Sequence, residues 1–118
     1  MAGHSIINYK GKEISYLDYR GLKLEEILKT IDDAVRTSVQ ENKRRPQLSN
    51  ITGVFAVPEF MDKVKEAGKM TKHLTSKSAV VGVTGAKKLL LNAYNAFTGA
   101  GLKPFDDEES AKEWLIKD

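Results

Sequence analysis

The sequence predicts a single α/β domain, with four helices packed on a mostly parallel mixed sheet of about five strands in the order ββαβαβαβα. Three observations predict this fold. The chain opens with a pattern typical of a β-hairpin, strand and helix patterns alternate after it, and residues 78–83 form a β-branched run that is apolar on both faces. The length of 118 residues suits one domain, which we assign to residues 1–118.

The first part of the chain predicts the hairpin and a long helix. Residues 4–9 and 14–19 are β-rich and partly alternating, and residues 10–12 between them contain the glycine of a short turn. Apolar residues then recur at helical spacing over 24–39, which predicts one buried helical face. Pro46 lies beyond the end of this helix, because proline lacks the amide hydrogen that a helix interior needs.

A third strand, a second helix and a central strand are expected next. The third strand is predicted over residues 47–55, which carry apolar side chains around a Thr-Gly pair. Pro58 is well placed as the first residue of the second helix, whose apolar positions from Val57 to Leu74 share one face. The central strand is the run 78–83, in which Gly82 leaves room for the close approach of another segment.

A third helix is expected over about residues 85–97, ended by the glycines of 98–101. The residues expected to face inward are Ala86, Leu89, Leu90, Ala93, Ala96 and Phe97. Leu91 and Tyr94 lie outside this arc and beside Lys87. They form either a surface for a partner or part of a helix that its neighbours bury more widely.

The last elements are a short strand and a helix. Residues 102–105 suit an edge strand, where Pro104 is tolerated because an edge has a side without ladder hydrogen bonds. Asp106 and Glu109 are spaced like a capping box for the final helix. We therefore assign the acidic run 106–109 to helix stability rather than to acid–base catalysis.

Composition limits the class of protein. The absence of cysteine excludes disulfides and thiolate zinc sites and suits a reducing cytoplasm, where we expect the protein to be located. No apolar run approaches the length of a membrane span, and the N-terminus lacks a signal-peptide pattern. Residues 42–103 hold 11 basic and 3 acidic side chains within a net charge of +3. This basic middle either meets an anionic partner or is the solvated surface of helices.

No catalytic or metal-binding motif stands out. The two histidines, His4 and His73, are far apart in the sequence, and no nucleophile elbow is present, so no enzyme, metal site or cofactor is predicted. Asp18 and Arg20 are the remaining charged candidates, because they follow a strand at an edge where α/β sheets bind ligands. The alternative is an ordinary ion pair at a strand end.

The start of the third helix predicts a candidate anion site. With Thr84 as N-cap, Lys87 and Lys88 fall in the first turn, where positive charge opposes the helix dipole by about 0.3 to 1 kcal/mol each. A phosphate or a phosphorylated partner at the Gly85 amide would relieve this opposition, and exposed lysines without a ligand are the alternative. The full P-loop pattern is absent, so no nucleotide-binding P-loop is predicted.

Segments spread over nearly the whole chain carry a resemblance to a known family. They are Tyr16-Leu-Asp-Tyr-Arg-Gly-Leu22, Leu48-Ser-Asn-Ile-Thr-Gly53, Lys77-Ser-Ala-Val-Val-Gly-Val-Thr-Gly85, Lys87-Lys88-Leu-Leu-Leu-Asn-Ala-Tyr-Asn-Ala-Phe-Thr-Gly99, Lys103-Pro-Phe-Asp106 and Ala111-Lys-Glu-Trp-Leu115. Together they resemble the SpoIIAA-like proteins, small bacterial relatives of the STAS domain, which is named for sulfate transporters and anti-sigma factor antagonists. The resemblance implies a sheet of about five strands with four helices.

In the antagonists of this group, phosphorylation of a serine near the end of the third strand, in an Asp-Ser-x-Gly setting, breaks binding to a kinase partner. This chain has Asn50-Ile-Thr-Gly53 at the corresponding place. The expected function is therefore a non-enzymatic regulatory or protein-interaction module. Its expected partner surface comprises Ser49, Thr52, Leu91 and Tyr94.

The alternative function is the binding of a small ligand. An anion or a nucleotide would bind at Thr84, Gly85, Lys87 and Lys88, and a lipid or another apolar molecule would bind between helices, as related lipid-transfer folds suggest. A protein partner is expected and a homodimer stays open. Nucleic acid is disfavoured as a partner, because the basic run 43–45 lacks interleaved aromatic residues.

Overall fold

The computed structural model describes residues 3–99 and 101–117, and it confirms the predicted fold class and element order. The five strands are β1 (Gly3–Tyr9), β2 (Lys12–Asp18), β3 (Arg45–Asn50), β4 (Thr75–Val81) and β5 (Lys103–Phe105). They form one sheet in the order β1-β2-β3-β4-β5, in which β1 and β2 are antiparallel and the other pairs are parallel. The helices are α1 (Leu24–Glu41), α2 (Pro58–Thr71), α3 (Lys87–Thr98) and α4 (Glu108–Ile116), with a short 3-10 turn, η1 (Lys72–Leu74), after α2.

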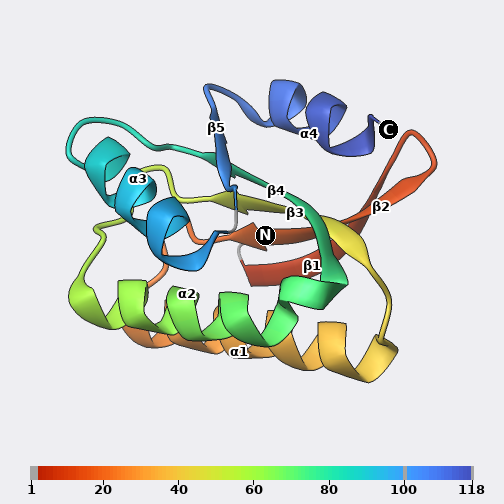
Figure 1. Cartoon of the computed structure of the whole chain (residues 1–118), viewed down its shortest axis with the longest axis horizontal. Helices are drawn as coiled ribbons and strands as arrows, with labels where there is room; N and C mark the ends of the chain where they lie inside the picture. Colours follow the sequence, from red (N-terminus) through yellow and green to blue (C-terminus); the bar gives the residue numbers. More distant parts are fainter. Residues whose placement is uncertain (1–2, 100, 118) are drawn as a thin grey trace.

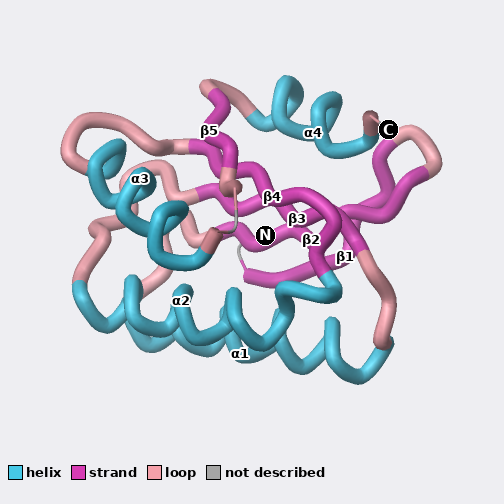
Figure 2. The backbone as a smooth tube through the Cα atoms, viewed as in Figure 1, coloured by secondary structure: helices cyan, strands magenta, loops and turns pink. Residues whose placement is uncertain are grey.

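The sheet lies between two layers of helices (Figures 1 and 2). Helices α1, α2 and α3 each connect two neighbouring parallel strands, and all three connections step across the sheet in the same direction. Because such connections are right-handed, the three helices lie on one face of the sheet. Helix α4 follows the last strand and covers the opposite face alone (Figure 1).

Alternation along the strands divides the core into two clusters. The cluster under α1 and α2 contains Leu17, Tyr19, Ile27, Ile31, Ala34, Val54 and Phe60. The cluster under α4 contains Ile14, Leu48, Ala79, Val81, Ala111 and Leu115. The rings of Tyr19 and Phe60 meet edge to face, with their centroids 5.4 Å apart. The predicted buried faces of the first two helices are therefore confirmed, apart from Val39 near the end of α1, which is 53% exposed.

The third strand is shorter than the sequence predicts, because Asn50 turns the chain. Its side-chain Oδ1 accepts hydrogen bonds from the backbone N and the hydroxyl of Thr52, at 3.1 and 2.7 Å. Asparagine competes with the sheet ladder in this way by bonding to the backbone two residues ahead. Val54 then enters the core from the loop, not from a strand.

Two helix starts also differ from prediction. Helix α3 begins at Lys87 with Ala86 as N-cap, two residues after Gly85. The N-cap of α4 is Asp107 and not Asp106, because Asp107 Oδ1 accepts a hydrogen bond from the Ser110 backbone N at 2.7 Å. The predicted glycine end of α3 is confirmed at Gly99, which has a φ of 67°, and Ala100 lies outside the described residues.

Gly82 brings two loops together at the end of the sheet, as the sequence predicts. Its φ is 98°, and a Cβ built on it would lie 2.4 Å from the backbone N of Thr52. The chain after β3 and the chain after β4 therefore touch through backbone atoms. This contact fixes the position of the segment that leads into α3.

The orientation of α3 is the main correction to the sequence analysis. Its one buried residue is Tyr94, whereas Leu89 is 74% exposed and Phe97 is 63% exposed. The arc expected to face inward thus faces mostly outward, with Leu90 at its border 38% exposed, because apolar residues occur all around this helix and periodicity alone does not select a face. Tyr94 packs against Gly68, which has no side chain to oppose it. Among the described helices, none is long and apolar enough to cross a membrane.

Candidate functional site

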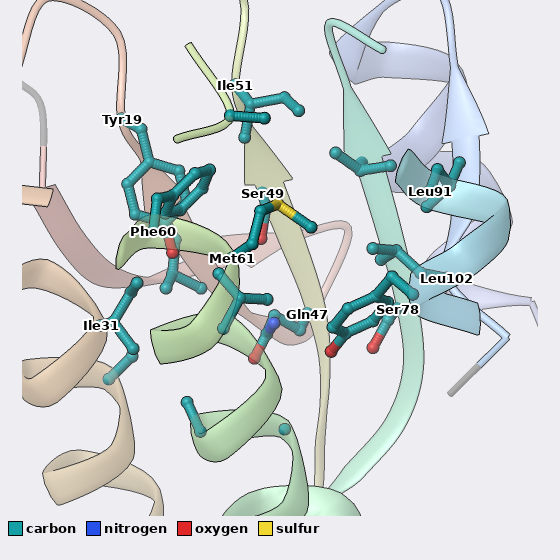
Figure 3. A pocket seen from close by; sticks show the side chains of 18 of the residues that line it. Tyr19, Ile31, Gln47, Ser49, Ile51, Phe60, Met61, Ser78, Leu91 and Leu102 are labelled. Carbon is teal, nitrogen blue, oxygen red and sulfur yellow. The ribbon is translucent and has the colours of Figure 1, made fainter. Parts of the chain in front are cut away.

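A cavity of about 120 Å³ lies between the sheet and helices α2 and α3 (Figure 3). Helix α4 packs directly on β3 and β4, and α1 packs on β1 and β2, whereas α2 and α3 stand further from the strands. The volume is comparable to that of an apolar cavity of about 150 Å³ that accepts benzene. The cavity is therefore large enough for a small organic group.

The size of the side chains on β3 and β4 explains the gap. The sheet presents Gln47 and Ser49 from β3 and Ser78 from β4 toward the helices (Figure 3). The other face of the same strands carries the larger, fully buried Leu48, which fills its layer. The helices contribute mostly apolar walls, among them Phe60, Met61, Val64, Leu90, Leu91 and Tyr94.

The cavity contains polar groups without protein partners. Gln47 and Ser78 are opposite each other in the parallel register of β3 and β4. The hydroxyls of Ser49 and Ser78 make no hydrogen bond to another described residue. No side-chain polar atom of the described residues is both fully buried and unpaired, so these hydroxyls open into the cavity. An apolar wall with a few polar groups is typical of a site for small molecules.

Lys87 lies at the end of the cavity next to the carboxyl ends of the strands. Its Nζ donates to the carbonyl oxygen of Ile51 at 3.1 Å and to that of Gly82 at 3.5 Å. Lys88, the next residue, is exposed and is not part of the cavity wall. The structure therefore separates the two lysines that the sequence groups in one anion site.

The backbone amides at the start of α3 are already hydrogen-bonded. The amide of Lys87 donates to the carbonyl oxygen of Thr84 at 3.2 Å, and that of Lys88 donates to Gly85 at 3.1 Å. Thr84 and Gly85 themselves are exposed. The amides of Lys87 and Lys88 are therefore not free to bind an anion, whereas the amide of Gly85, to which the sequence analysis assigns the anion, donates to no described residue.

The residues of the predicted partner surface lie in two places. Ser49, Leu91 and Tyr94 line the cavity, whereas Thr52 is exposed at the end of β3 with its hydroxyl donating to Asn50. Burial raises the pKa of the Tyr94 phenol. Sequence reasoning misses the role of Ser78, although polar Gln47 and Ser49 on either side of Leu48 are a signal that one face of β3 is not filled with apolar side chains.

On the face of the sheet opposite the cavity, a separate polar network joins α4 to the strands. Glu108 Oε2 accepts hydrogen bonds from the Tyr16 hydroxyl at 2.5 Å and from Asn50 Nδ2 at 2.6 Å. Arg20 donates through Nε and Nη2 to the two carboxylate oxygens of Asp18, both at 2.9 Å, and this lowers the pKa of Asp18. The charged groups satisfy one another, which supports the ion-pair interpretation of Asp18 and Arg20.

The remaining charged candidates are also engaged in the fold. Arg45 is buried and pairs with Glu13 and Glu41, and Lys43 pairs with Glu13 as well. The basic run 43–45 therefore does not form a free cationic surface. In the described part of the chain, no group of three histidine, aspartate or glutamate side chains is placed to hold a metal ion.

His4 is held by a neighbouring strand. Its Nε2 lies 2.9 Å from the hydroxyl oxygen of Ser15, which is itself buried. Burial lowers the pKa of His4, so the neutral imidazole is favoured. The pair joins the edge strand β1 to β2.

Comparison of the chain with models of known protein families, with curated proteins and with solved structures found no match. The resemblance to the SpoIIAA-like proteins stays a prediction from the residues. The geometry of the cavity is therefore the basis for a proposed function.

Proposed function

We propose that this protein is a binding domain for a small, mainly apolar ligand held between the sheet and helices α2 and α3. The cavity is the observation that carries the proposal. A ligand that fills the space of about 120 Å³ buries its apolar surface against the walls formed by α2 and α3, and burial of apolar area contributes about 25 cal/mol per Å², which drives binding.

Straight-chain alcohols from butanol to decanol provide a first test. Burial of each methylene contributes about 0.8 kcal/mol, so the dissociation constant is expected to fall about fourfold per added carbon until the cavity is full. Isothermal titration calorimetry measures the constants, and the melting temperature should rise in the same order. The absence of both heat and thermal shift along the whole series would reject the proposal.

A cavity-filling variant tests whether the ligand binds in this cavity. Ser78→Leu places a larger apolar side chain in the cavity, so we expect equal or greater stability together with a loss of alcohol binding. Ser76→Leu is the matched control, because Ser76 lies on the same strand, is exposed and is outside the cavity wall. Unchanged binding in Ser78→Leu would place the ligand elsewhere.

A second candidate function is the regulatory or protein-interaction role that the resemblance implies. Its support is the outer face of α3, where Leu89 and Phe97 are exposed. The ammonium groups of Lys65 and Lys69 lie 5.0 and 5.1 Å from the centre of the Phe97 ring. An apolar face with adjacent lysines fits a protein partner that presents apolar residues next to carboxylates.

Affinity capture with surface variants tests this second function. Leu89→Ser and Phe97→Ser are expected to lose a partner that the wild-type protein retains, because both remove exposed apolar area from α3. Val39→Ser on α1 is the control, since Val39 is also an exposed apolar residue but lies on another helix. Identical partners for all three variants would reject a binding role for the outer face of α3.

A further inference from the structure

The side chain of Lys87 extends along the cavity wall toward the carboxyl end of the sheet. Its ammonium donates to the carbonyl oxygens of Ile51 and Gly82, the second at the long distance of 3.5 Å. An ammonium group has three donors, so at least one hydrogen remains for another acceptor. The described residues provide no third acceptor for Lys87 Nζ, so this hydrogen is available to water or to a molecule inside the cavity.

The positive charge of Lys87 has no counter-ion within the fold. No carboxylate of the described residues lies within ion-pairing distance of its Nζ. The group is half-buried, and it lies in the first turn of α3, where the helix dipole opposes a cation. A bound anion would offset both unfavourable effects, whereas a neutral ligand would offset neither.

The donors at this end of the cavity suit a carboxylate better than a phosphate. The amides of Lys87 and Lys88 are used by the turn before α3, which leaves the ammonium as the charged donor. Phosphate groups are usually held by several charged or amide donors at once, whereas one ammonium suffices for a carboxylate. The rest of the ligand must be apolar to match the walls formed by α2 and α3.

We infer that the cavity takes an alkyl or aryl carboxylate, with the apolar part between the sheet and α3 and the carboxylate on the ammonium of Lys87. The inference rests on the proposed binding function and adds the chemical class of the ligand. It also assigns different roles to two adjacent lysines, because Lys87 contacts the ligand and Lys88 faces solvent.

Octanoate and octanamide test the inference, because they share length and shape and differ in charge. In the wild-type protein we expect octanoate to bind about tenfold more tightly, as a charge-assisted hydrogen bond predicts. Lys87→Met is expected to remove this preference and to leave octanamide binding unchanged. Lys88→Met is the matched control and should keep the wild-type preference. Isothermal titration calorimetry at neutral pH measures the affinities of both compounds for all three proteins.

The outcomes distinguish a failure of the proposed binding function from a failure of the carboxylate inference. If neither compound binds to the wild-type protein, the binding function itself is wrong. If both bind equally, or if Lys87→Met keeps the preference for octanoate, the carboxylate inference is wrong and the binding function stands. Tighter binding of octyl phosphate than of octanoate would also overturn the carboxylate inference. Lys87→Gln, which removes the charge and keeps a polar side chain, replaces Lys87→Met if that variant does not fold, and should likewise bind both compounds equally.

Discussion

The phenolic oxygen of Tyr94 lies against the backbone of Gly68, so that a Cβ built on Gly68 would be 2.8 Å from it. Glycine in the interior of a helix costs about 1 kcal/mol relative to alanine. Its presence in the middle of α2 is explained by this contact, because the absence of a side chain lets α3 approach α2 through the tyrosine.

A double-mutant cycle tests the contact between α2 and α3. Gly68→Ala should give little or no gain in the wild-type background, because the clash with the hydroxyl cancels the gain in helix propensity. In a Tyr94→Phe background the nearest ring carbon would be 3.9 Å away, and the same substitution should stabilise by about 0.5 to 1 kcal/mol. Urea unfolding measures both values. Equal gains in the two backgrounds would show that the hydroxyl does not limit this contact.

Gly82 should be the least replaceable glycine at the end of the sheet. Gly82→Ala combines a positive φ with a Cβ position 2.4 Å from the backbone N of Thr52, so we expect a loss of about 3 kcal/mol. Gly85→Ala is the control, because its φ is also positive but no atom lies within 4 Å of the new Cβ. That variant should lose about 1 to 2 kcal/mol. Similar losses from both substitutions would contradict the close approach of the two loops.

Ionisation of the tyrosine phenols should determine the alkaline pH at which the folded state loses stability. Burial raises the pKa of Tyr19 and Tyr94, burial and the Glu108 hydrogen bond raise that of Tyr16, and the Glu113 hydrogen bond raises that of Tyr9. The folded state therefore favours neutral phenols. Their stabilising contribution is complete below the unfolded pKa of 10.0 and is lost as the pH rises toward the folded values.

Phenolate absorbance and circular dichroism, followed together against pH, measure this effect. We expect phenolate to form only as the fold is lost, well above pH 10.0. In Glu108→Gln, which removes the negative charge next to Tyr16, the Tyr16 phenolate should form at a lower pH than in the wild-type protein. Titration of all phenols near pH 10.0 in a protein that stays folded would disprove the assignment.

Two lysines lie over Trp114, the only tryptophan of the chain. Comparing their variants distinguishes stabilisation by helix capping from stabilisation by cation–π attraction. Lys77 Nζ donates to the carbonyl oxygens of Trp114 and Lys117 at 3.0 and 2.7 Å, at the end of α4, and lies 4.9 Å from the Trp114 ring centre. Lys103 Nζ lies 5.2 Å from the same ring centre and has no such hydrogen bond. Lys77→Met should therefore lose about 1 to 2 kcal/mol, and Lys103→Met less than about 1 kcal/mol.

Unfolding followed by Trp114 fluorescence measures both variants, and hydrogen exchange of the last turn of α4 locates the effect. We expect faster exchange in Lys77→Met only, because the capping hydrogen bonds are lost in that variant alone. Equal effects from both substitutions would mean that the charge over the ring, and not the cap, stabilises α4.

The sequence predicts the order of the elements because each signal for it is local. The glycine turn of the hairpin, Pro58 at the start of α2 and the edge position of Pro104 depend on the backbone of a few neighbouring residues. The early end of β3 at Asn50 is missed, since an asparagine in an apolar run gives no pattern of its own. The face that α3 buries is missed because it is decided by Gly68, on another helix.

The candidate site is predictable only in part, because a cavity is a property of several elements at once. Lys87 is a candidate from the sequence, whereas an apolar site between helices is suggested only by analogy with related lipid-transfer folds. The pairing of Lys87 with the carbonyl oxygen of Ile51, and the gap over Ser49 and Ser78, depend on how far α2 and α3 stand from the strands. The distance between these helices and the strands cannot be predicted from the sequence pattern of any one element.

Helix α3 is both a wall of the cavity and a part of the molecular surface, and Leu90 contributes to both, since it lines the cavity and is 38% exposed. Tyr94 lies on the inner face, and Leu89 and Phe97 lie on the outer face. A helix of 12 residues moves as one body, so a ligand that displaces Tyr94 also displaces the outer side chains. Binding of the ligand would then change the shape of the outer face of α3. By reciprocity, if the ligand changes the affinity of a partner for that face, the partner changes the affinity for the ligand by the same factor.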